Sequence, residues 1–205
     1  MSPRPRKVSD DDVFAATYRT MVRLGPGELT LAQIAAEAGV TAGALVQRFG
    51  SKRELLLALS AGAASSAGDL IRGLRATARS PLAAVRAYVD CMAQLAASPA
   101  ALARNLAYLQ IDLADPDFRK HLLVQSRATR RGLEELLDEA RAKGEIVRST
   151  DVVRLARSVE TILSGTMLTW AVYRDGSAKQ WMRDDLEAVL APYLARRRSG
   201  SGKSA

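Results

Sequence analysis

Residues 30–55 read TLAQIAAEAGVTAGALVQRFGSKREL, and this stretch decides the fold of the N-terminal part of the chain. A hydroxyl at Thr30 followed three residues later by Gln33 has the spacing of a helix-capping box, and Gly39 suits the left-handed turn past a helix end. Two short helices therefore meet at a glycine turn, as in a helix-turn-helix motif. The inward-facing apolar positions of this pair are Leu31, Ile34, Ala35, Val40, Leu45 and Phe49.

The second helix leaves small, amide and basic side chains on its open faces. This arrangement is typical of a recognition helix that enters the major groove of DNA. The residues on these faces are Ala42, Gly43, Ala44, Val46, Gln47 and Arg48. For Gln47 two interpretations stay open, because its amide suits a base edge and the solvent equally well.

The same stretch resembles the helix-turn-helix signature of the tetracycline-repressor (TetR) family of transcriptional regulators, over about residues 10–58. The residues that carry the resemblance are Ile34, Ala35, Ala38, Gly39, Val40, Thr41, Gly43, Leu45, Phe49, Ser51, Lys52 and Leu55. The family implies a homodimer whose N-terminal domains bind a palindromic operator in double-stranded DNA. It also implies C-terminal domains that hold a pocket for a small-molecule effector and the dimer interface.

Two further positions acquire DNA-contacting roles through the resemblance. Thr41 is similar to the residue that caps the recognition helix and meets a phosphate, and Lys52 is similar to the family's phosphate-contacting lysine. The helix that starts after Ser51 adds backbone N–H groups that attract an anion. The alternative for Lys52 and Arg48 is an ordinary solvated charge.

Departures from the family's pattern change the expected DNA contacts. Val46 stands where the family usually has a tyrosine, so one phosphate hydrogen bond is missing. Ala44 stands where a threonine is usual, which leaves only apolar readout, such as contact with a thymine methyl group. Arg48, where a histidine is often found, supplies a compensating phosphate contact in this interpretation.

The rest of the chain repeats the start and stop signals of helices. Starts lie at Ser9, Ser51, Ser177, Ser80-Pro81, Ser98-Pro99 and Asp115-Pro116, and stops at Gly25, Gly50, Gly144 and Gly176. No segment alternates convincingly with the period of a strand. The sequence predicts an all-α protein of about nine helices: a three-helix DNA-binding domain at residues 1–58, a larger ligand-binding and dimerisation domain at 59–195, and a disordered tail at 196–205.

Apolar periodicity predicts which faces are buried. In the first helix the apolar positions are Phe14, Tyr18, Met21 and Val22. A long helix is expected from Pro116 to about Lys143, and the next, from about Asp151, is apolar on two sides. A helix of that kind is buried nearly all round. In a chain of this size we expect burial against a second copy, so that the last two helices form a homodimer.

The ligand pocket is predicted only through the family resemblance. The candidate ligand-binding residues are Tyr88, Cys91, Met92, Leu95, Leu106, Leu109, Met167 and Trp170. For each of them ordinary core packing is the alternative explanation. Asp112 lies among apolar neighbours and suits a polar or cationic ligand, or the solvent.

Composition sets limits on the class of protein. With 48% apolar and 25% charged residues, the chain has the balance of a globular protein, and its net charge of +8 attracts polyanions. Four of these charges lie on Arg196, Arg197, Arg198 and Lys203. Near the start, two interpretations of Arg4, Arg6 and Lys7 stay open. These residues either enter a minor groove, as basic arms do, or remain solvated, and the acids that follow at 10–12 favour the second interpretation.

Other classes of function lack the residues they need. Cys91 and His121 are the single cysteine and histidine, so neither a disulfide nor a His/Cys metal cluster can form within one chain. No nucleophile with a base beside it is visible, so we expect neither an enzyme nor a cofactor. The start lacks the apolar core of a secretory signal, and the apolar run at 55–68 falls short of the ~20 residues of a membrane span, which predicts a cytoplasmic protein without membrane contact.

These observations favour a ligand-responsive transcriptional repressor that binds DNA as a homodimer. One alternative is a helical ligand carrier or small-molecule enzyme with a vestigial DNA-binding head, which would act on a small molecule without salt-sensitive DNA binding. Another alternative is a constitutive DNA organiser that binds no ligand. A C-terminal domain without a cavity would support this alternative.

Overall fold

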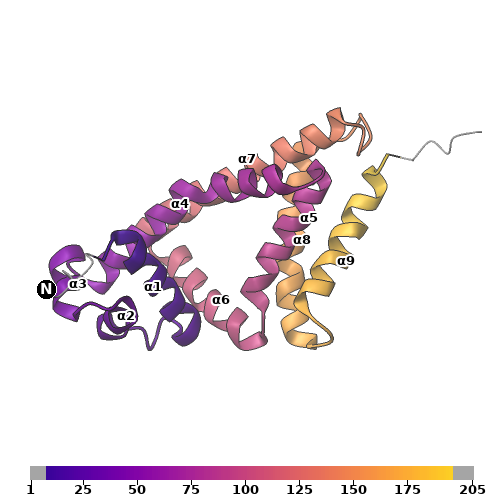
Figure 1. The fold of residues 1–205 in the computed structure, drawn as a ribbon. Helices are drawn as coiled ribbons and strands as arrows, with labels where there is room; N and C mark the ends of the chain where they lie inside the picture. Colours follow the sequence, from indigo (N-terminus) through magenta and orange to yellow (C-terminus); the bar gives the residue numbers. More distant parts are fainter. Residues whose placement is uncertain (1–7, 196–205) are drawn as a thin grey trace, which may run out of the picture. The chain divides into compact units, whose positions relative to one another are not determined.

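The computed structural model describes residues 8–195, and within this range the chain forms nine α-helices and no named strand (Figure 1). The helices are α1 (Asp10–Leu24), α2 (Leu31–Ala38), α3 (Ala42–Phe49), α4 (Lys52–Thr77), α5 (Pro81–Met92), α6 (Pro99–Ala114), α7 (Pro116–Ala142), α8 (Val152–Tyr173) and α9 (Ala178–Leu190). Short 3₁₀ segments at Ala93–Ala96 and Ala191–Tyr193 follow α5 and α9. The prediction of an all-α fold with about nine helices is confirmed.

Side-chain caps set the starts of the helices, as their sequence signals predicted. Ser9 and Asp12 form a reciprocal capping box at the start of α1. The hydroxyls of Ser80 and Ser98 each accept a hydrogen bond from a backbone N–H in the first turn of α5 and α6. The predicted stop glycines adopt positive φ values that L side chains rarely adopt; they are Gly25, Gly39, Gly50, Gly144 and Gly176.

The described residues divide into two compact units, each with its own core. Unit 1 comprises residues 8–68 and 95–128, and unit 2 comprises residues 69–94 and 129–195. The division differs from the predicted boundary after residue 58, because α6 and the first half of α7 cluster with the N-terminal helices. Whether DNA-binding and ligand-binding functions separate at that boundary stays a prediction.

In unit 1, the helix-turn-helix packs around a small apolar core. The fully buried members of this core are Val13, Leu29, Ile34, Ala35, Leu45 and Leu55. The rings of Phe14 and Phe49, with centroids 5.9 Å apart, connect α1 with α3. The Nε of Arg104 donates to the Val22 carbonyl at 2.7 Å and so fastens α6 to the end of α1.

The buried face of α1 differs from the predicted one. Tyr18 is 53% exposed and Val22 37% exposed, whereas Thr17 and Thr20 are fully buried. The threonine hydroxyls donate to the carbonyls of Val13 and Ala16 at 2.8 Å, so each polar group is satisfied within its own helix. Burial of these threonines is therefore not penalised by an unsatisfied hydroxyl.

Unit 2 packs the end of α4, α5, the second half of α7, α8 and α9 around a larger core. Its fully buried members include Val85, Val89, Leu133, Leu137, Ala156, Val159, Met182 and Leu190. Two pairs of charged side chains connect α5 with α9: the Arg86 guanidinium donates to Glu187 at 2.6 and 2.9 Å, and that of Arg183 donates to Asp90 at 2.6 and 2.5 Å.

One side of α8 remains open in a single chain. Leu155, Val159 and Leu163 are buried, as predicted, but Leu168, Val172 and Tyr173 are 48%, 79% and 71% exposed. The near-complete burial predicted for this helix is therefore not reached within one copy of the chain.

The fourth helix is continuous across the Ala/Ser/Gly-rich stretch at its centre. By length and composition alone, α4 qualifies as long and apolar enough to cross a membrane, whereas the sequence interpretation took its apolar run to be too short. The difference arises because the helix continues past Asp69 to Thr77. A single helix of this kind is weak support for a membrane span, and Leu55 and Ile71 of α4 are buried in the cores of units 1 and 2.

Two sequence predictions fall on residues outside the described range. These are the DNA-contacting or solvated role of Arg4, Arg6 and Lys7, and the disorder of the tail at 196–205.

Candidate nucleic-acid interface

The helix-turn-helix is formed by α2 and α3, and its turn has the predicted chemistry. Thr30 and Gln33 form a reciprocal capping box at the start of α2. Gly39 ends α2 in the left-handed conformation, at φ 69° and ψ 32°. Thr41 then caps α3, with its hydroxyl accepting from the Ala44 N–H at 3.1 Å. Thr41 therefore caps the recognition helix, as predicted. Its contact with a phosphate stays a prediction.

The two faces of α3 have different environments. Leu45 is 1% exposed in the unit 1 core, whereas Val46 on the next position is 47% exposed. Gly43, Ala44, Gln47 and Arg48 are exposed as well. Ala42 is an exception to the predicted open face, because it is partly buried and packs against the core. Most of the predicted DNA-facing side chains therefore lie on one solvent-accessible surface of α3.

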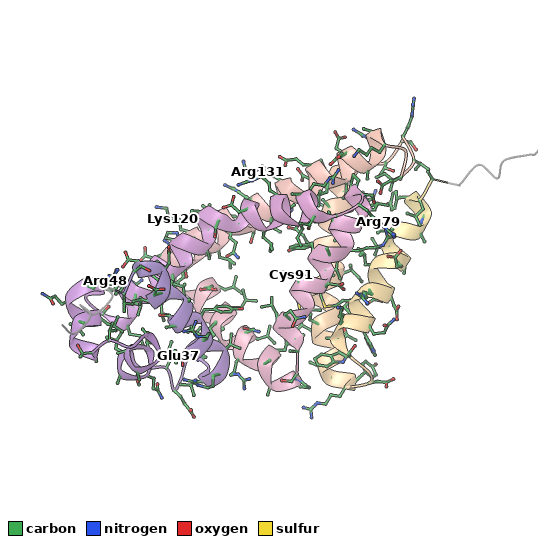
Figure 2. The ribbon with its side chains drawn as sticks, in the orientation of Figure 1. Glu37, Arg48, Arg79, Cys91, Lys120 and Arg131 are labelled. Carbon is green, nitrogen blue, oxygen red and sulfur yellow. The ribbon has the colours of Figure 1, made fainter. Side chains whose placement is uncertain are left out.

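Arg48 has partners inside unit 1. Its Nη1 donates to the Val8 carbonyl at 2.9 Å, its Nη2 is ion-paired with Asp10, and its guanidinium carbon lies 5.5 Å from the centre of the Phe49 ring. Figure 2 labels Arg48 on α3. A phosphate that binds Arg48 must compete with these partners. Neither the charge of Arg48 nor its position in the family's pattern indicates that the partners exist.

Lys52 also has a partner that the sequence did not reveal. Its Nζ donates to the Leu29 carbonyl at 2.8 Å, and its side chain is partly buried. It therefore connects the start of α4 to the residue that precedes the N-cap of α2. Ser51 accepts from the Glu54 N–H at 3.1 Å, which is the capping contact predicted for this helix start. Phosphate binding by Lys52 stays a prediction.

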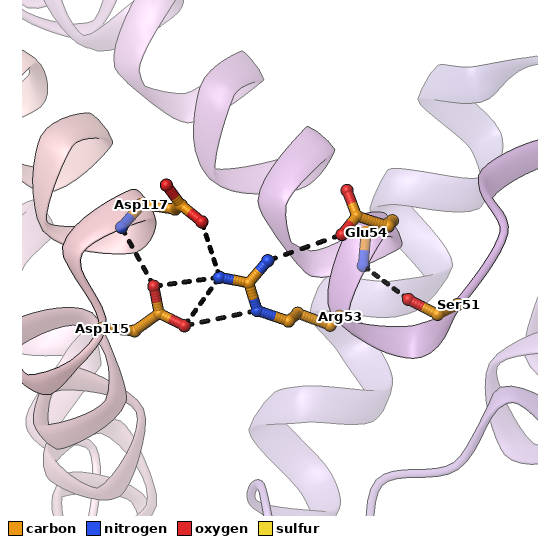
Figure 3. A network of polar contacts seen from close by, with 5 residues as sticks. All are labelled: Ser51, Arg53, Glu54, Asp115 and Asp117. Carbon is orange, nitrogen blue, oxygen red and sulfur yellow. Dashed lines mark hydrogen bonds and ion pairs between the residues drawn. The ribbon is translucent and has the colours of Figure 1, made fainter.

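A second polar cluster, which sequence reasoning missed, holds the start of α4 against the junction of α6 and α7 (Figure 3). The Arg53 guanidinium binds Asp115 at 2.8 Å and Asp117 at 2.7 Å. The hydrogen bond from Arg53 is the main cause that lowers the pKa of Asp115, and the hydrogen bonds that Arg53 donates to Asp117 and Asp115 raise the pKa of Arg53. Asp115 was identified only as a helix cap, because its distance from Arg53 in the sequence gave no sign of the pairing.

A third cluster fixes α2 on α1. The Glu37 carboxylate accepts from Arg19 at 2.8 Å and from Arg23 at 3.2 Å. The hydrogen bond from Arg19 is the largest cause of a lowered pKa at Glu37. The orientation of the helix-turn-helix is thus maintained by charged contacts at its edges as well as by its apolar core.

The predicted ligand-binding residues divide between the two units. Tyr88, Cys91, Met92, Met167 and Trp170 belong to unit 2, and Leu95, Leu106 and Leu109 belong to unit 1. Tyr88, Met92 and Met167 pack in or against the unit 2 core, which is the alternative explanation for them. The indole of Trp170 donates to the Gly176 carbonyl at 3.3 Å. Cys91 is partly buried on α5 (Figure 2). Their shared role in a pocket stays a prediction.

Two neighbouring polar groups on α6 have no hydrogen-bond partner in the described part of the chain. The Tyr108 hydroxyl is buried without a partner, and burial raises the pKa of this tyrosine to about 12. Asp112, one turn further on, is partly buried, and desolvation raises its pKa. The choice between ligand contact and solvent for Asp112 stays open.

Shallow grooves on unit 1 involve other residues. One, of about 400 Å³, lies between α4 and α7 and is lined by Leu57, Ala61, Lys120 and His121 among others. Another, of about 320 Å³, lies between α1 and α2 beside Arg19 and Glu37. Neither is lined by a predicted ligand-binding residue. In the described range, no group of three or more His, Cys, Asp or Glu side chains is placed to hold a metal ion.

Known proteins share this architecture. The sequence model of the family described as bacterial regulatory proteins, tetR family, matches residues 13–59. A TetR transcription regulator from Haloarcula marismortui is 19% identical, with a TM-score of 0.73 over 90% of this chain and 97% of that one. SmeT, the repressor of the Stenotrophomonas maltophilia multidrug efflux pump SmeDEF, is 20% identical, with a TM-score of 0.65 over 93% of each chain.

A third similar structure is the fatty acid degradation regulator FadR from Bacillus halodurans, at 19% identity and a TM-score of 0.66 over 89% of this chain and 98% of that one. At these identities the structures show a common fold. No curated protein sequence matches the chain.

The capped helix pair, the exposed face of α3 and the all-helical remainder define a helix-turn-helix transcriptional regulator that binds DNA. The sequence model of the tetR family matches residues 13–59, so this segment, which includes α2 and α3, is similar to the corresponding segment of that family.

Proposed function

We propose that the protein is a ligand-responsive repressor that binds a palindromic operator as a homodimer. The observation that carries this proposal is the environment of α3, where Leu45 is buried while Val46, Gln47 and Arg48 are exposed. A helix anchored on one side and open on the other is suited to enter a major groove. The proposal also places the protein in the cytoplasm, where its DNA is, and assigns it no enzymatic activity.

In this proposal the subunits associate through α8 and α9. The support is the exposed apolar side of α8, where Val172 is 79% and Leu168 48% exposed. Burial of such side chains against a second copy is favourable, at roughly 25 cal/mol for each Å² removed from water. Two α3 helices then contact successive major grooves when they lie about one DNA turn, ~34 Å, apart.

The effector acts by shifting a conformational equilibrium. A small molecule that binds better to a state with the two α3 helices at another spacing favours that state and weakens operator binding. The change in DNA affinity is limited by the difference between the effector's affinities for the two states. The names of the similar proteins do not assign an effector to this chain.

The proposal is tested by measuring mass and DNA selectivity on the full chain. Light scattering after gel filtration is expected to give twice the 22.1 kDa of one chain. Selection from a random duplex library is expected to return an inverted repeat. Val172→Glu on α8 should reduce both dimerisation and DNA affinity, whereas Val124→Glu, at the exposed Val124 on α7, should leave both unchanged.

The outcomes also separate the alternative functions. A monomer that selects no sequence contradicts the repressor, and a small molecule bound or turned over by such a monomer favours the carrier or enzyme. Alternatively, the protein selects an inverted repeat while no compound from a small-molecule library alters its binding. That outcome favours the constitutive DNA organiser.

A further inference from the structure

Gln47 lies at the centre of the exposed face of α3. Leu45, two positions before it, is 1% exposed, and Phe49, two positions after it, packs against the unit 1 core. Consecutive residues of an α-helix are turned by about 100°, so a residue midway between these two projects from the opposite side of the helix. Gln47 is accordingly exposed. Its amide is therefore the group of α3 that projects most directly away from the core.

The amide of Gln47 is also free to bind another molecule. The hydroxyl of the N-cap Thr41 accepts from a backbone N–H in the first turn of α3. The Arg48 guanidinium donates to the Val8 carbonyl and is ion-paired with Asp10. Of the polar side chains of α3 and its N-cap, the amide of Gln47 alone has no partner within the described residues. It offers both a hydrogen-bond donor and an acceptor.

The helical turn before Gln47 carries little bulk. Side chains on a helix lean toward its N-terminus, so the Gln47 side chain extends over Gly43 and Ala44. The fold does not require glycine at position 43, because its φ is not positive and an added Cβ would meet only the Thr41 hydroxyl oxygen, at 4.0 Å. Since glycine is a poor helix former, its presence here favours a close approach of another molecule to the backbone of α3.

We propose that Gln47 recognises an adenine in the major groove of each operator half-site. Its Oε1 accepts a hydrogen bond from the adenine N6 amino group, and its Nε2 donates to the adenine N7, which is the bidentate match between glutamine and adenine. The neighbouring exposed side chains, Ala44 and Val46, have only apolar groups, which suit thymine methyl groups. This inference rests on the proposed operator binding and names the base that α3 reads by hydrogen bonds.

Parallel selections from a random duplex library test the assignment on the full chain. The wild type is expected to return an inverted repeat with adenine at one position of each half-site. Gln47→Ala should accept any base at that position, because no hydrogen-bonding side chain remains there. Gln47→Arg should prefer guanine at the same position, since the O6 and N7 of guanine match a guanidinium. The other positions of the half-site should keep their wild-type preferences.

A modified base measures the contact with adenine N7 directly. In 7-deazaadenine this acceptor is replaced by a C–H group while pairing with thymine is retained. The selected duplex is prepared with 7-deazaadenine at the assigned position of both half-sites and titrated by fluorescence anisotropy. Wild-type affinity is expected to fall about fivefold or more, because the Nε2 donor of Gln47 loses its partner. Gln47→Ala should bind the modified and unmodified duplexes equally well.

Gln125 on α7 supplies the matched control. It is also an exposed glutamine of unit 1 without a partner in the described part of the chain. Gln125→Ala and Gln125→Arg remove the same amide and add the same charge, and both should keep every wild-type base preference. Thermal unfolding of all four variants should match the wild type, because both positions are exposed.

Two results overturn the inference and leave operator binding intact. One is a Gln47→Ala chain that still selects adenine at every position where the wild type does. The other is an equal loss of affinity for the 7-deazaadenine duplex in the wild type and Gln47→Ala. A wild-type chain that selects no duplex contradicts the proposed function itself.

Discussion

Arg48, in the last turn of α3, is ion-paired with Asp10, the first residue of α1. A cation on the proposed DNA surface is thus partly neutralised from within the same unit. The pair is largely accessible to solvent, with side-chain exposures of 35% for Arg48 and 57% for Asp10. Pairs of this kind contribute about 0.2–1 kcal/mol, so a phosphate can replace the carboxylate at modest cost.

Asp10→Asn is therefore expected to tighten DNA binding. Release of Arg48 from an exposed pair worth about 0.2–1 kcal/mol corresponds to a Kd lowered by about 1.4- to fivefold. Asp11→Asn is the matched control, because it removes the same charge from the same exposed helical turn. Anisotropy titrations of both variants measure the effect. Equal Kd values for the two variants would show that only the general field changed and that Arg48 is not involved.

The contact between α4 and α7 leads to a prediction on stability. A Cβ atom added at Gly132 would lie 2.9 Å from Cδ1 and 3.2 Å from Cβ of Ile71. Gly132→Ala is expected to destabilise the protein by about 1–3 kcal/mol, because overpacking displaces a buried side chain. Urea denaturation followed by circular dichroism measures this change.

Gly73→Ala is the control for helix propensity. Gly73 is exposed on α4 and an added Cβ there meets no atom within 4 Å, so its replacement should stabilise by about 0.5–1 kcal/mol. If Gly132→Ala stabilises as well, the two helices do not approach as closely as the structure has them.

Acid stability depends on the pairing of Glu139. Hydrogen bonds from Arg75, at 2.6 and 2.7 Å, and then from Lys143 lower the pKa of Glu139 to about 2. A carboxylate whose folded-state pKa is depressed stabilises the fold above its unfolded pKa, near 4.3, and this contribution is lost as the pH falls toward 2. Glu139→Gln should therefore lower the urea midpoint at pH 7 and lose less stability than the wild type between pH 4.5 and about 2. Parallel curves for the two proteins would contradict the assignment.

Much of the fold could be predicted because its signals are local. The capping boxes at Ser9 and Thr30 and the turn at Gly39 are set by residues within one helical turn of each other, and all three are as predicted. The burial of Thr17 and the exposure of Tyr18 were missed, because hydropathy does not include the hydrogen bond from the threonine hydroxyl to its own helix.

The sequence predicted which residues lie on the exposed face of the candidate site, but not the contacts that these residues make within the protein. The exposed face of α3 follows from helical periodicity, whereas the partners of Arg48, Lys52 and Arg53 depend on chain segments that meet only in three dimensions. The end of α8 was also unpredictable in detail, since Arg174 takes the left-handed conformation at the position where glycine is usual. Ligand-binding residues were assigned by resemblance alone, and no local signal distinguishes them from core residues of the same helices, such as Val85.

The central claim is that the open face of α3 contacts DNA. Val46→Glu tests it most directly, because Val46 is 47% exposed on that face and its replacement leaves the apolar core intact. Val124→Glu is the control, since Val124 is also 47% exposed but lies on α7. Anisotropy titration with the selected duplex is predicted to show DNA affinity reduced about 100-fold or more for Val46→Glu, through repulsion between its carboxylate and the phosphates, and wild-type affinity for Val124→Glu. Wild-type affinity for Val46→Glu, with its thermal unfolding unchanged, would contradict the claim.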